Sequence, residues 1–351
     1  MPSAIFVLTL WYKNQNYKFP WREYTTPYSI WISEIMLQQT QVSTVIPYFN
    51  NWMKKFPSID SIANADLNDL HKAWEGLGYY RRVENIHRTS KLILKEYDSK
   101  MPNTYNELIK LYGIGDYTAS AILAIAYNKD YYAIDGNLKR ILSRLFLIPK
   151  NKQVLSMYKK YCSKLINKGN PSISIQACMD LGREICKSQN QKCNICPISS
   201  FCKAYQRNKI HLYPAQRNKK LKLKYDVVVA FINNNNSFLI SKRYANKFLG
   251  NLWELPGGKV KYKETQHDAL IREMKEELDI KIIINKYLGL VNHKYSHFEV
   301  NLFLYDCNLY SGTPKSLQSQ EIKWITKKEI KQFTFPKGTH KLFNLIMNND
   351  V

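Results

Sequence analysis

Four cysteines are crowded into one short segment of this 351-residue chain. Cys186, Cys193, Cys196 and Cys202 follow the spacing C-x6-C-x2-C-x5-C. Four thiolates can converge on one centre if the chain wraps tightly around it, and such a set suits either zinc or an iron–sulfur cluster. Zinc sites usually consist of two short C-x2-C pairs separated by a longer segment, which this spacing lacks. Four buried cysteines without a metal are the alternative.

A single carboxylate, Glu34, lies among bulky apolar residues in the run from Tyr28 to Val42. A carboxyl group in such surroundings resists ionisation, so its pKa should rise and suit it to general-acid catalysis. A solvent-facing glutamate on an amphipathic helix is the alternative.

A glycine turn and a second carboxylate follow later in the chain. Gly113-Ile114-Gly115 precedes a helix pattern, and Ile134-Asp135-Gly136-Asn137 comes about twenty residues later. The glycines allow a close approach of the backbone to a phosphate, which the free amides of the helix N-terminus can bind. Asp135 or Asn137 could simply cap the next helix. Capping is compatible with catalysis, because a helix N-terminus favours an ionised carboxylate.

The C-terminal third contains an ordered set of acidic residues, with Glu264 and Arg272 ahead of three glutamates. Glu273, Glu276 and Glu277 have i, i+3 and i+4 spacing, so they share one helix face and could hold Mg²⁺. A solvated acidic face is the alternative.

Taken together, these motifs resemble the MutY-type adenine DNA glycosylases of the endonuclease III-like helix-hairpin-helix superfamily. The cysteine spacing is similar to the [4Fe-4S] loop of that superfamily, and the segments 33–42 and 74–80 match its S-E-x-M-L-Q-Q-T-Q-V and W-x-G-L-G-Y-Y signatures. Residues 258–280 resemble a Nudix box, except that Asp279 stands where that family has glycine. The resemblance covers nearly the whole chain.

The resemblance implies a role for each catalytic residue. The equivalent of Glu34 protonates adenine on N7, and the equivalent of Asp135 stabilises the oxocarbenium-like sugar, with Tyr117 and Asn137 assisting. Bifunctional relatives carry a lysine where this chain has Tyr117, and tyrosine cannot form a Schiff base. The resemblance therefore implies a monofunctional enzyme that leaves the abasic strand whole.

The resemblance also implies base and DNA contacts. Those in the helical part are expected from Arg22, Gln38, Gln39, Leu77, Tyr79, Gly113, Gly115 and Gln176. Tyr295-Ser296-His297 resembles a Phe-Ser-His loop that reads 8-oxoguanine, with Tyr295 in place of the phenylalanine. Outside the family context, Tyr79 would be a core aromatic residue.

The elements that must position these residues fall into two classes. A helical pattern runs from Tyr28 to about Phe201, whereas strand patterns dominate after Tyr225, with one helix at Gln266 to Leu278. We expect an all-α helix-hairpin-helix glycosylase domain (1–205, cluster loop 186–202), a basic linker (206–224) and an α+β Nudix-like domain (225–351) that recognises 8-oxoguanine.

Charge and composition indicate the partner and the compartment. Fifty-two Lys and Arg against 28 Asp and Glu give a net charge of +24, which favours a polyanionic partner such as nucleic acid. The resemblance narrows this partner to duplex DNA with A:8-oxoguanine or A:G mispairs. We expect no membrane association, a monomer, and a bacterial cytoplasmic, nucleoid-associated location, because the cysteine usage suits a reducing compartment.

Three other functions would use part of the same motifs. They are a bifunctional endonuclease III-like lesion glycosylase, a Nudix hydrolase of oxidised nucleotides with a DNA-binding module, and a non-enzymatic iron–sulfur DNA sensor. Tyr117 and the C-terminal domain argue against the first. The joint presence of Glu34 and Asp135 argues against the last.

Overall fold

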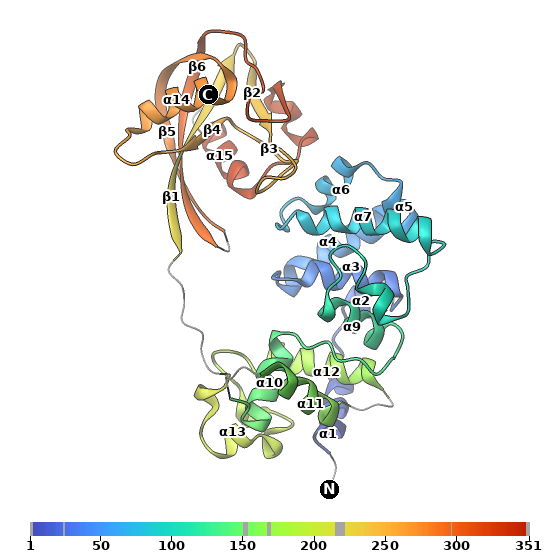
Figure 1. Ribbon diagram of the computed structural model, residues 1–351. Coiled ribbons are helices and arrows are strands. Elements are labelled where there is room, and N and C mark those ends of the chain that lie inside the picture. Colours follow the sequence, from blue (N-terminus) through green and yellow to red (C-terminus); the bar gives the residue numbers. More distant parts are fainter. Residues whose placement is uncertain are drawn as a thin grey trace. The chain divides into compact units, whose positions relative to one another are not determined.

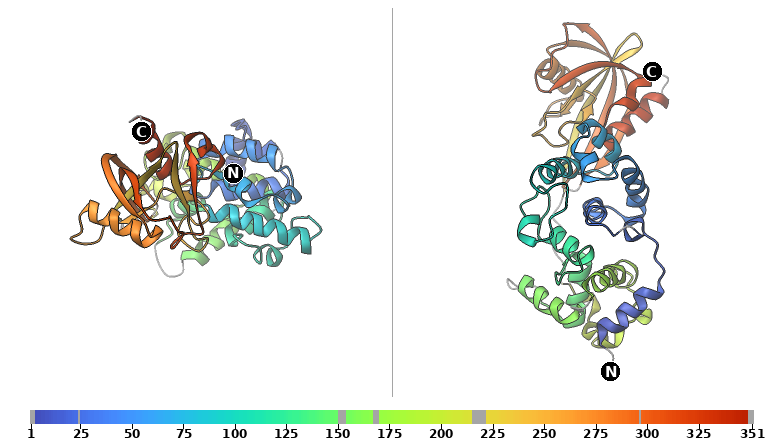
Figure 2. Two further views of the ribbon diagram at one scale, coloured as in Figure 1. Left: turned by 90° about the horizontal axis from the view of Figure 1, so that it is seen from above. Right: turned by 90° about the vertical axis from the view of Figure 1, so that its right-hand side faces the viewer.

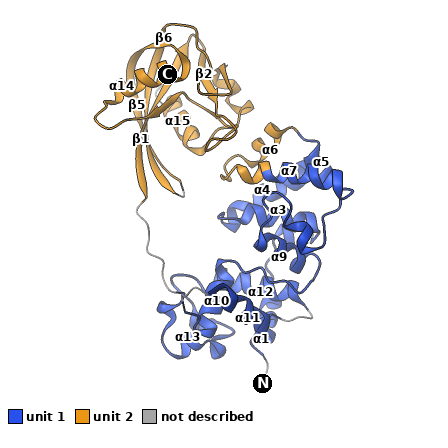
Figure 3. Cartoon of the chain, in the orientation of Figure 1, with its two compact units in different colours: residues 1–65, 85–218 blue, residues 66–84, 219–351 orange. Residues whose placement is uncertain are grey.

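The computed structural model describes residues 3–23, 25–149, 154–166, 170–214, 222–295 and 297–348. The chain divides into two compact units (Figures 1 and 3). Unit 1 comprises residues 1–65 and 85–218, and unit 2 comprises residues 66–84 and 219–351. Residues 66–84 fall within the expected helical domain (1–205), but their contacts group them with the C-terminal residues in unit 2.

Unit 1 is helical. Polar side chains cap several of its helices; for example, Thr26 accepts a hydrogen bond from the Ser29 amide, and Asn170 accepts one from the Ile173 amide. Its helices are α1 (Ala4–Asn14), α2 (Pro20–Glu23), α3 (Pro27–Leu37), α4 (Val42–Lys55), α5 (Ile59–Ala63), α7 (Arg81–Glu96, from Asn85 onward), α8 (Tyr105–Leu108), α9 (Asp116–Ile125), α10 (Gly136–Phe146), α11 (Val154–Leu165), α12 (Pro171–Glu184) and α13 (Lys203–Gln206), with short 3₁₀ turns at Cys193–Ile195, Ser199–Phe201 and Ile210–Leu212.

Two helices of unit 1 lie in its interior. Every residue of α3 from Tyr28 to Met36 is buried, as is every residue of α9 from Thr118 to Ile125. A helix that is apolar on all sides belongs in a core rather than at a surface. α3 packs against α9, and both α9 and α10 pack against α12. The helices that carry Glu34 and Tyr117 are therefore fixed by packing on every side.

Unit 2 is built around a mixed sheet in the order β3-β2-β1-β6-β5, with β4 paired to β1 and β7 paired to β2. β1 and β6 run parallel, and the other described pairs are antiparallel. The strands are β1 (Leu223–Asn234), β2 (Ser237–Lys242), β3 (Trp253–Glu254), β4 (Gly257–Lys259), β5 (Lys281–Lys294), β6 (Phe298–Ser311) and β7 (Glu321–Thr326), and the helices are α6 (Leu67–Trp74), α14 (Gln266–Leu278) and α15 (Lys337–Asn348), with a 3₁₀ turn at Lys327–Gln332.

Alternate residues of β1 build two separate cores. Val228, Ala230 and Ile232 face α14, whereas Val229 and Phe231 face α15. This follows from the two-residue period of a strand that is covered on both faces. α14 and α15 accordingly lie on opposite sides of the sheet (Figures 1 and 2).

The expected fold class is confirmed: a helical part is followed by a mixed-sheet part, and the helix Gln266–Leu278 has the bounds that we expected. The described elements that were not predicted include α1, β7 and α15. In α1 the run AIFVLTLW is apolar except for Thr9, so no helical period is visible in it. Of the expected basic linker, residues 215–221 lie outside the described residues, and β1 already begins at Leu223.

No described helix is both long enough and apolar enough to span a membrane.

Candidate active site

A cavity of about 590 Å³ opens in unit 1 between α2, α3, α9, α10 and α12. Most of the catalytic and adenine-contacting side chains expected in the helical part line it. Its described lining includes Trp21, Arg22, Glu34, Gln38, Gln39, Tyr117, Asp135, Asn137, Gln176, Asp180 and Arg183. Residues separated by more than a hundred positions in the sequence therefore meet at one site.

Glu34 lies on the buried helix α3 and is only 6% exposed. The Tyr117 hydroxyl, from α9, donates a hydrogen bond of 2.7 Å to its Oε2 atom. Burial raises the pKa of Glu34 to about 7, and the charge of Asp135 adds to the rise, while the hydrogen bond from Tyr117 opposes it. A carboxyl group with a pKa near neutrality can both hold and release a proton under physiological conditions.

Asp135 caps the N-terminus of α10. Its Oδ1 accepts a hydrogen bond of 2.7 Å from the Leu138 amide, and its Oδ2 accepts one of 2.9 Å from Asn137 Nδ2. Burial raises the pKa of Asp135, although these donors and Arg140 lower it. The capping geometry expected from the sequence is present, but burial outweighs the helix terminus in setting the direction of the pKa. Two carboxyl groups with different partners thus line one cavity.

Asn137 links the aspartate to the start of the cysteine segment. Arg140 Nη2 donates 2.8 Å to Asn137 Oδ1 and 2.7 Å to the Gly182 carbonyl, and its Nε donates 2.6 Å to the Cys186 carbonyl. A Cβ atom at Gly182 would lie 2.5 Å from Asn137 Cβ, so only glycine fits at this position of α12. The side chains around Asp135 are therefore held by close packing and charged donors together.

One wall of the cavity is a charged pair: Arg22 was expected there, whereas its acidic partner, Asp180, was not predicted from the sequence. Arg22 forms two hydrogen bonds with Asp180, at 2.6 and 3.0 Å, and Arg183 lies 3.2 Å from the same carboxylate. Gln176 accepts a hydrogen bond of 3.3 Å from the Tyr12 hydroxyl. Asp180 carries no motif of its own, and the one available signal was a lone acid on the apolar face of a helix.

Two turns that are expected to contact DNA lie in unit 1: one contains Gln38 and Gln39, and the other contains Gly113 and Gly115. Gln39 has a φ of 57°, and Gln38 Nε2 lies 3.5 Å from Thr118 Oγ1. Gly113 has a φ of 76°, and a Cβ atom there would lie 2.9 Å from Asn85 Cβ. Gly115 is the N-cap of α9, and its amide and those that follow start that helix. This turn provides the backbone shape that an N-terminal phosphate site needs.

The four clustered cysteines are neighbours in unit 1. The pKa of the Cys196 thiol is raised to about 12, chiefly by burial and further by the charges of Cys186, Cys202 and Cys193, which shows that the four sulfurs share one neighbourhood. Arg144 Nη1 donates a hydrogen bond of 3.2 Å to Cys186 Sγ. The donor set therefore suits an iron–sulfur centre in kind. Among the described residues, however, no group of three or more ligand-type side chains is already gathered as a metal site.

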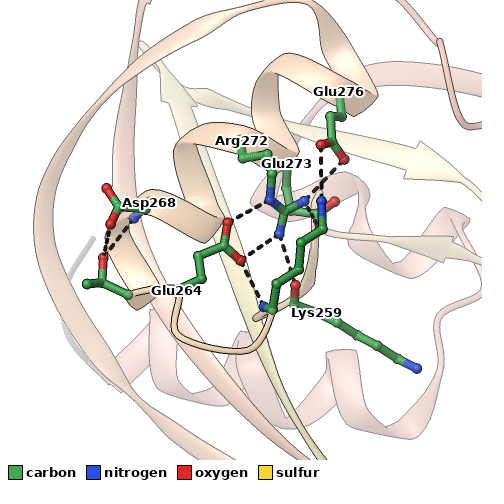
Figure 4. A network of polar contacts seen from close by, with 8 residues as sticks. Lys259, Glu264, Asp268, Arg272, Glu273 and Glu276 are labelled. Atoms are coloured by element: carbon green, nitrogen blue, oxygen red, sulfur yellow. Dashed lines mark hydrogen bonds and ion pairs between the residues drawn. The ribbon is translucent and has the colours of Figure 1, made fainter.

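The acidic residues of α14 do not form an open cluster of three carboxylates. Arg272 donates to Glu264 at 2.7 and 2.9 Å, to Glu273 at 2.7 Å and to Glu276 at 3.1 Å (Figure 4). Glu277 instead accepts a hydrogen bond of 3.2 Å from the Gly257 amide. Burial raises the pKa of Glu277 to about 8. An arginine thus already neutralises two of the three carboxylates expected to hold Mg²⁺.

The remaining expected residues lie in unit 2. Tyr79 has a φ of 49° and is 40% exposed, whereas Leu77 is buried. Tyr295 is partly buried and His297 is exposed, and Ser296 lies outside the described residues. At the end of α14, Asp279 has the left-handed backbone (φ 56°) that glycine would otherwise supply.

Comparisons with known proteins agree with this geometry. Residues 32–168 match the HhH-GPD superfamily of base excision DNA repair proteins, and residues 227–345 match the NUDIX domain family. The chain is 34% identical over 347 residues to an adenine DNA glycosylase of Buchnera aphidicola (subspecies Schizaphis graminum), covering 97% of each chain. It is 28% identical to an adenine DNA glycosylase of Rattus norvegicus, covering 96% of this chain and 77% of the relative.

One solved structure supports the fold of the helical part. A thermostable thymine-DNA glycosylase aligns with a TM-score of 0.54 at 23% identity, over 58% of this chain and 95% of the other.

Proposed function

The chain belongs to the adenine DNA glycosylase family, and on this premise we propose that it removes adenine paired with 8-oxoguanine or guanine in duplex DNA without cutting the strand. The pairing of Glu34 with Tyr117 at 2.7 Å inside the cavity carries this proposal. The family hydrolyses N-glycosyl bonds, and for adenine this reaction needs a proton donor for the base and a negative charge beside the sugar.

Proton donation begins the reaction. Adenine is a poor leaving group, so a proton must reach its ring before the bond to the sugar breaks. The base has to leave the helical stack and enter a pocket, and the cavity beside Glu34 is large enough to accept it. Because burial raises the pKa of Glu34 to about 7, this carboxyl group can still carry the required proton near neutral pH, where an ordinary glutamate is ionised.

Asp135 serves the other half of the reaction. Loss of adenine leaves positive charge on the sugar, and a nearby carboxylate stabilises it, as in glycoside hydrolysis by paired carboxylates. Asn137 and the Leu138 amide fix the orientation of Asp135, while Tyr117 fixes that of Glu34. The arrangement supports separate roles, with Glu34 as the acid and Asp135 as the anion that stabilises the positively charged sugar.

Strand cleavage is not expected. It requires an amine that attacks the sugar, and Tyr117 provides a hydroxyl whose pKa burial raises well above its ordinary value. This hydroxyl therefore stays protonated and donates to Glu34. The absence of a lysine at position 117 supports a monofunctional enzyme.

DNA is held by the basic surface and by turns. The net charge of +24 attracts the phosphate backbone, and the Gly113–Gly115 turn offers amides to one phosphate. Arg22, Gln38 and Gln176 line the cavity and would contact the flipped adenine. Gln39, Leu77 and Tyr79 would occupy the disrupted stack, since an exposed aromatic ring replaces base stacking. We propose that one chain acts alone as a monomer.

The C-terminal part reads the oxidised base. Tyr295, Ser296 and His297 would contact 8-oxoguanine, and α14 would act as a scaffold behind them. Arg272 supports the scaffold role, because it already pairs with Glu264, Glu273 and Glu276. Mg²⁺ is then not required for adenine release.

The cysteine loop would hold a [4Fe-4S] cluster through Cys186, Cys193, Cys196 and Cys202. When bound, such a cluster would join the four cysteines and so crosslink the loop that carries them. Arg144 would donate to the sulfur of Cys186, as it does in the structure. The crosslinked loop would in turn fix Arg140 and Asn137 beside the active site.

Incubation with a duplex that holds one A:8-oxoguanine pair, followed by alkali, tests the proposal. We expect alkali-dependent strand breaks at the adenine and none without alkali. Borohydride should trap no enzyme–DNA adduct. Breaks without alkali, or efficient trapping, would rule out the monofunctional assignment. A duplex with A:T is the matched control and should stay intact.

A further inference from the structure

Two acidic residues flank the loop that carries Tyr79, here called the Tyr79 loop (residues 76–80). Glu75 precedes it, and Glu84 follows on the first turn of α7. Both side chains bind residues that are more than 160 positions later in the sequence but lie in the same compact unit. The hydrogen bonds within the loop come from Trp74 and Arg82 instead, so the two glutamates hold the loop against distant segments of unit 2.

Glu75 is the first anchor. Its Oε1 accepts a hydrogen bond of 2.9 Å from the Phe335 amide and lies 2.8 Å from His340 Nε2, and its Oε2 accepts one of 2.7 Å from Lys72. Lys72 also donates 2.9 Å to the Phe333 carbonyl. Burial by itself would raise the pKa of Glu75. The hydrogen bonds from His340, Lys72 and the Phe335 amide together lower it by more, so the pKa lies below its ordinary value. The anchor is therefore an ionised carboxylate surrounded by donors.

Glu84 is the second anchor. Its Oε1 accepts a hydrogen bond of 2.9 Å from Asn251 Nδ2, and His71 Nε2 lies 3.5 Å from the same oxygen. Asn251 Oδ1 accepts in turn from Gln320 Nε2 at 3.0 Å, and Asn251 has a φ of 62°. Asparagine tolerates this left-handed conformation better than most residues, so Asn251 can occupy the turn while its side chain binds Glu84.

The Tyr79 loop between the anchors is stiff. Arg82 Nη2 donates hydrogen bonds of 3.0 Å to the carbonyls of Leu77 and Gly78, and Trp74 Nε1 donates one of 3.1 Å to Gly78. Gly76, Gly78 and Tyr79 all have positive φ values. A loop that is braced internally moves as one body, so its position is set by what holds its two ends.

The elements that supply the anchors also hold Tyr295. Phe248, three residues before Asn251, packs edge-on against the Tyr295 ring with centroids 5.1 Å apart. Gly338, two residues before His340 on α15, lies beside the Tyr295 hydroxyl, which would be in van der Waals contact, at 3.6 Å, with a Cβ atom at this position. The segment 248–251 and the start of α15 therefore each contact both a glutamate beside the Tyr79 loop and the side chain of Tyr295.

We propose that Glu75 and Glu84 are positioning residues, which hold the Tyr79 loop at a fixed distance from Tyr295 so that both aromatic side chains engage the same damaged base pair. The inference builds on the proposed reading of 8-oxoguanine. It adds that preference for the oxidised base depends on residues that touch neither the DNA nor the reacting atoms. Proton donation by Glu34 in unit 1 is independent of both anchors.

The test measures binding and chemistry separately in the full-length protein. Binding is measured with duplexes that carry non-cleavable 2′-fluoro-2′-deoxyadenosine opposite 8-oxoguanine or guanine, and chemistry as the single-turnover rate at saturating enzyme. Glu75→Gln, His340→Ala and Asn251→Ala should each lower the preference for 8-oxoguanine roughly tenfold, the effect of about one charge-assisted hydrogen bond. The saturated rate should change less than about twofold.

Two variants separate positioning from general damage to the fold. His340→Gln should restore most of the preference, because its amide nitrogen replaces Nε2 as a donor to Glu75. His267→Ala alters an exposed histidine on α14 that packs on Tyr305, and it should leave the preference unchanged. Amide hydrogen exchange in residues 76–80 should increase in His340→Ala but not in His340→Gln.

A double-mutant cycle completes the test. On a Tyr79→Ala background, Glu75→Gln should cause no further loss, because both changes remove the same contact. Losses that multiply, or unchanged preference in all three anchor variants, would overturn the inference. If the unaltered protein shows no preference for 8-oxoguanine, the proposed function fails instead, and the exchange data still show whether the anchors hold the loop.

Discussion

At the scale of single residues, Glu34 combines two demands that oppose each other. It must be buried to hold a proton near neutral pH, yet an ionised carboxylate in that position weakens the fold. The hydrogen bond from Tyr117 offsets only part of the burial, since the pKa of Glu34 remains raised to about 7. The burial that suits Glu34 to protonate adenine therefore also lowers the stability of the folded protein whenever this carboxyl group is ionised.

Replacing Glu34 tests its catalytic role. Glu34→Gln keeps the size of the side chain and removes the proton, so adenine release in a single turnover should fall at least about a hundredfold. Binding to a duplex with A:8-oxoguanine should stay within about threefold of normal, since no phosphate contact changes. Release at a near-normal rate would show that Glu34 is not the acid.

The raised pKa of Glu34 makes stability depend on pH. In the unfolded chain the carboxyl ionises near its ordinary value of 4.5, and in the native state near 7. Its contribution is therefore fully present below pH 4.5 and is lost as pH rises to about 7, by up to about 3 kcal/mol. Thermal unfolding should show Glu34→Gln to be more stable than the unaltered protein at pH 8, with the difference vanishing at pH 4. Equal stability at pH 8 would contradict the raised pKa.

At the scale of elements, the approach of α12 to α10 determines where Asn137 and Asp135 lie. Gly182 is the point of closest approach, because an added Cβ atom would overlap Asn137. Arg140 closes the same junction through Asn137 and the Gly182 carbonyl. The packing of two helices thus sets the orientation of a catalytic side chain.

A methyl group at position 182 should disturb the site through this junction. Gly182→Ala should displace Asn137 and reduce the single-turnover rate roughly tenfold, while the melting temperature falls by a few degrees. On an Asn137→Gly background the same change should have little further effect on the rate, because the Cβ atom that the new methyl group would overlap is gone. An unchanged rate in Gly182→Ala would show that Asn137 does not orient Asp135.

The helix α14 offers a contrasting prediction. Glu276 is partly exposed and shares Arg272 with two other carboxylates, so Glu276→Gln should leave adenine release within about twofold of normal. Mg²⁺ and EDTA should also leave the rate unchanged. A strong dependence on Mg²⁺ would show that the scaffold role of α14 is incomplete.

At the scale of the whole molecule, a strongly basic chain combines a helical unit that holds the chemistry with a sheet-based unit that includes the Tyr79 loop. The cysteine segment lies at the end of unit 1, and its role as an iron–sulfur loop can be measured directly. Protein purified without air should contain about four irons per chain and absorb broadly in the visible region. Removing the iron should loosen residues 186–202 and lower DNA binding before it alters the rate of adenine release at saturation. Stoichiometric zinc without iron would contradict the assignment.

The sequence alone determined the fold class, the candidate acid and the helix Gln266–Leu278. These depend on local patterns: apolar residues around Glu34, a capping residue at Asp135 and a period of 3.6 in α14. It also left Asp135 or Asn137 as a candidate cap for the next helix, and the structure shows that Asp135 is the cap of α10. These features depend on residues that are close together in the sequence, so they can be predicted without knowing which distant residues are in contact.

Only the tertiary structure decided which distant residues meet. The Asp180 carboxylate beside Arg22, the contact of Gly182 with Asn137, and the binding of Glu75 and Glu84 to Phe335, His340 and Asn251 join segments with no shared pattern. The pKa of Asp135 is likewise raised by burial, which the helix terminus alone would not predict. Burial and long-range contact depend on how whole helices and strands pack, and that packing cannot be read from a short stretch of sequence.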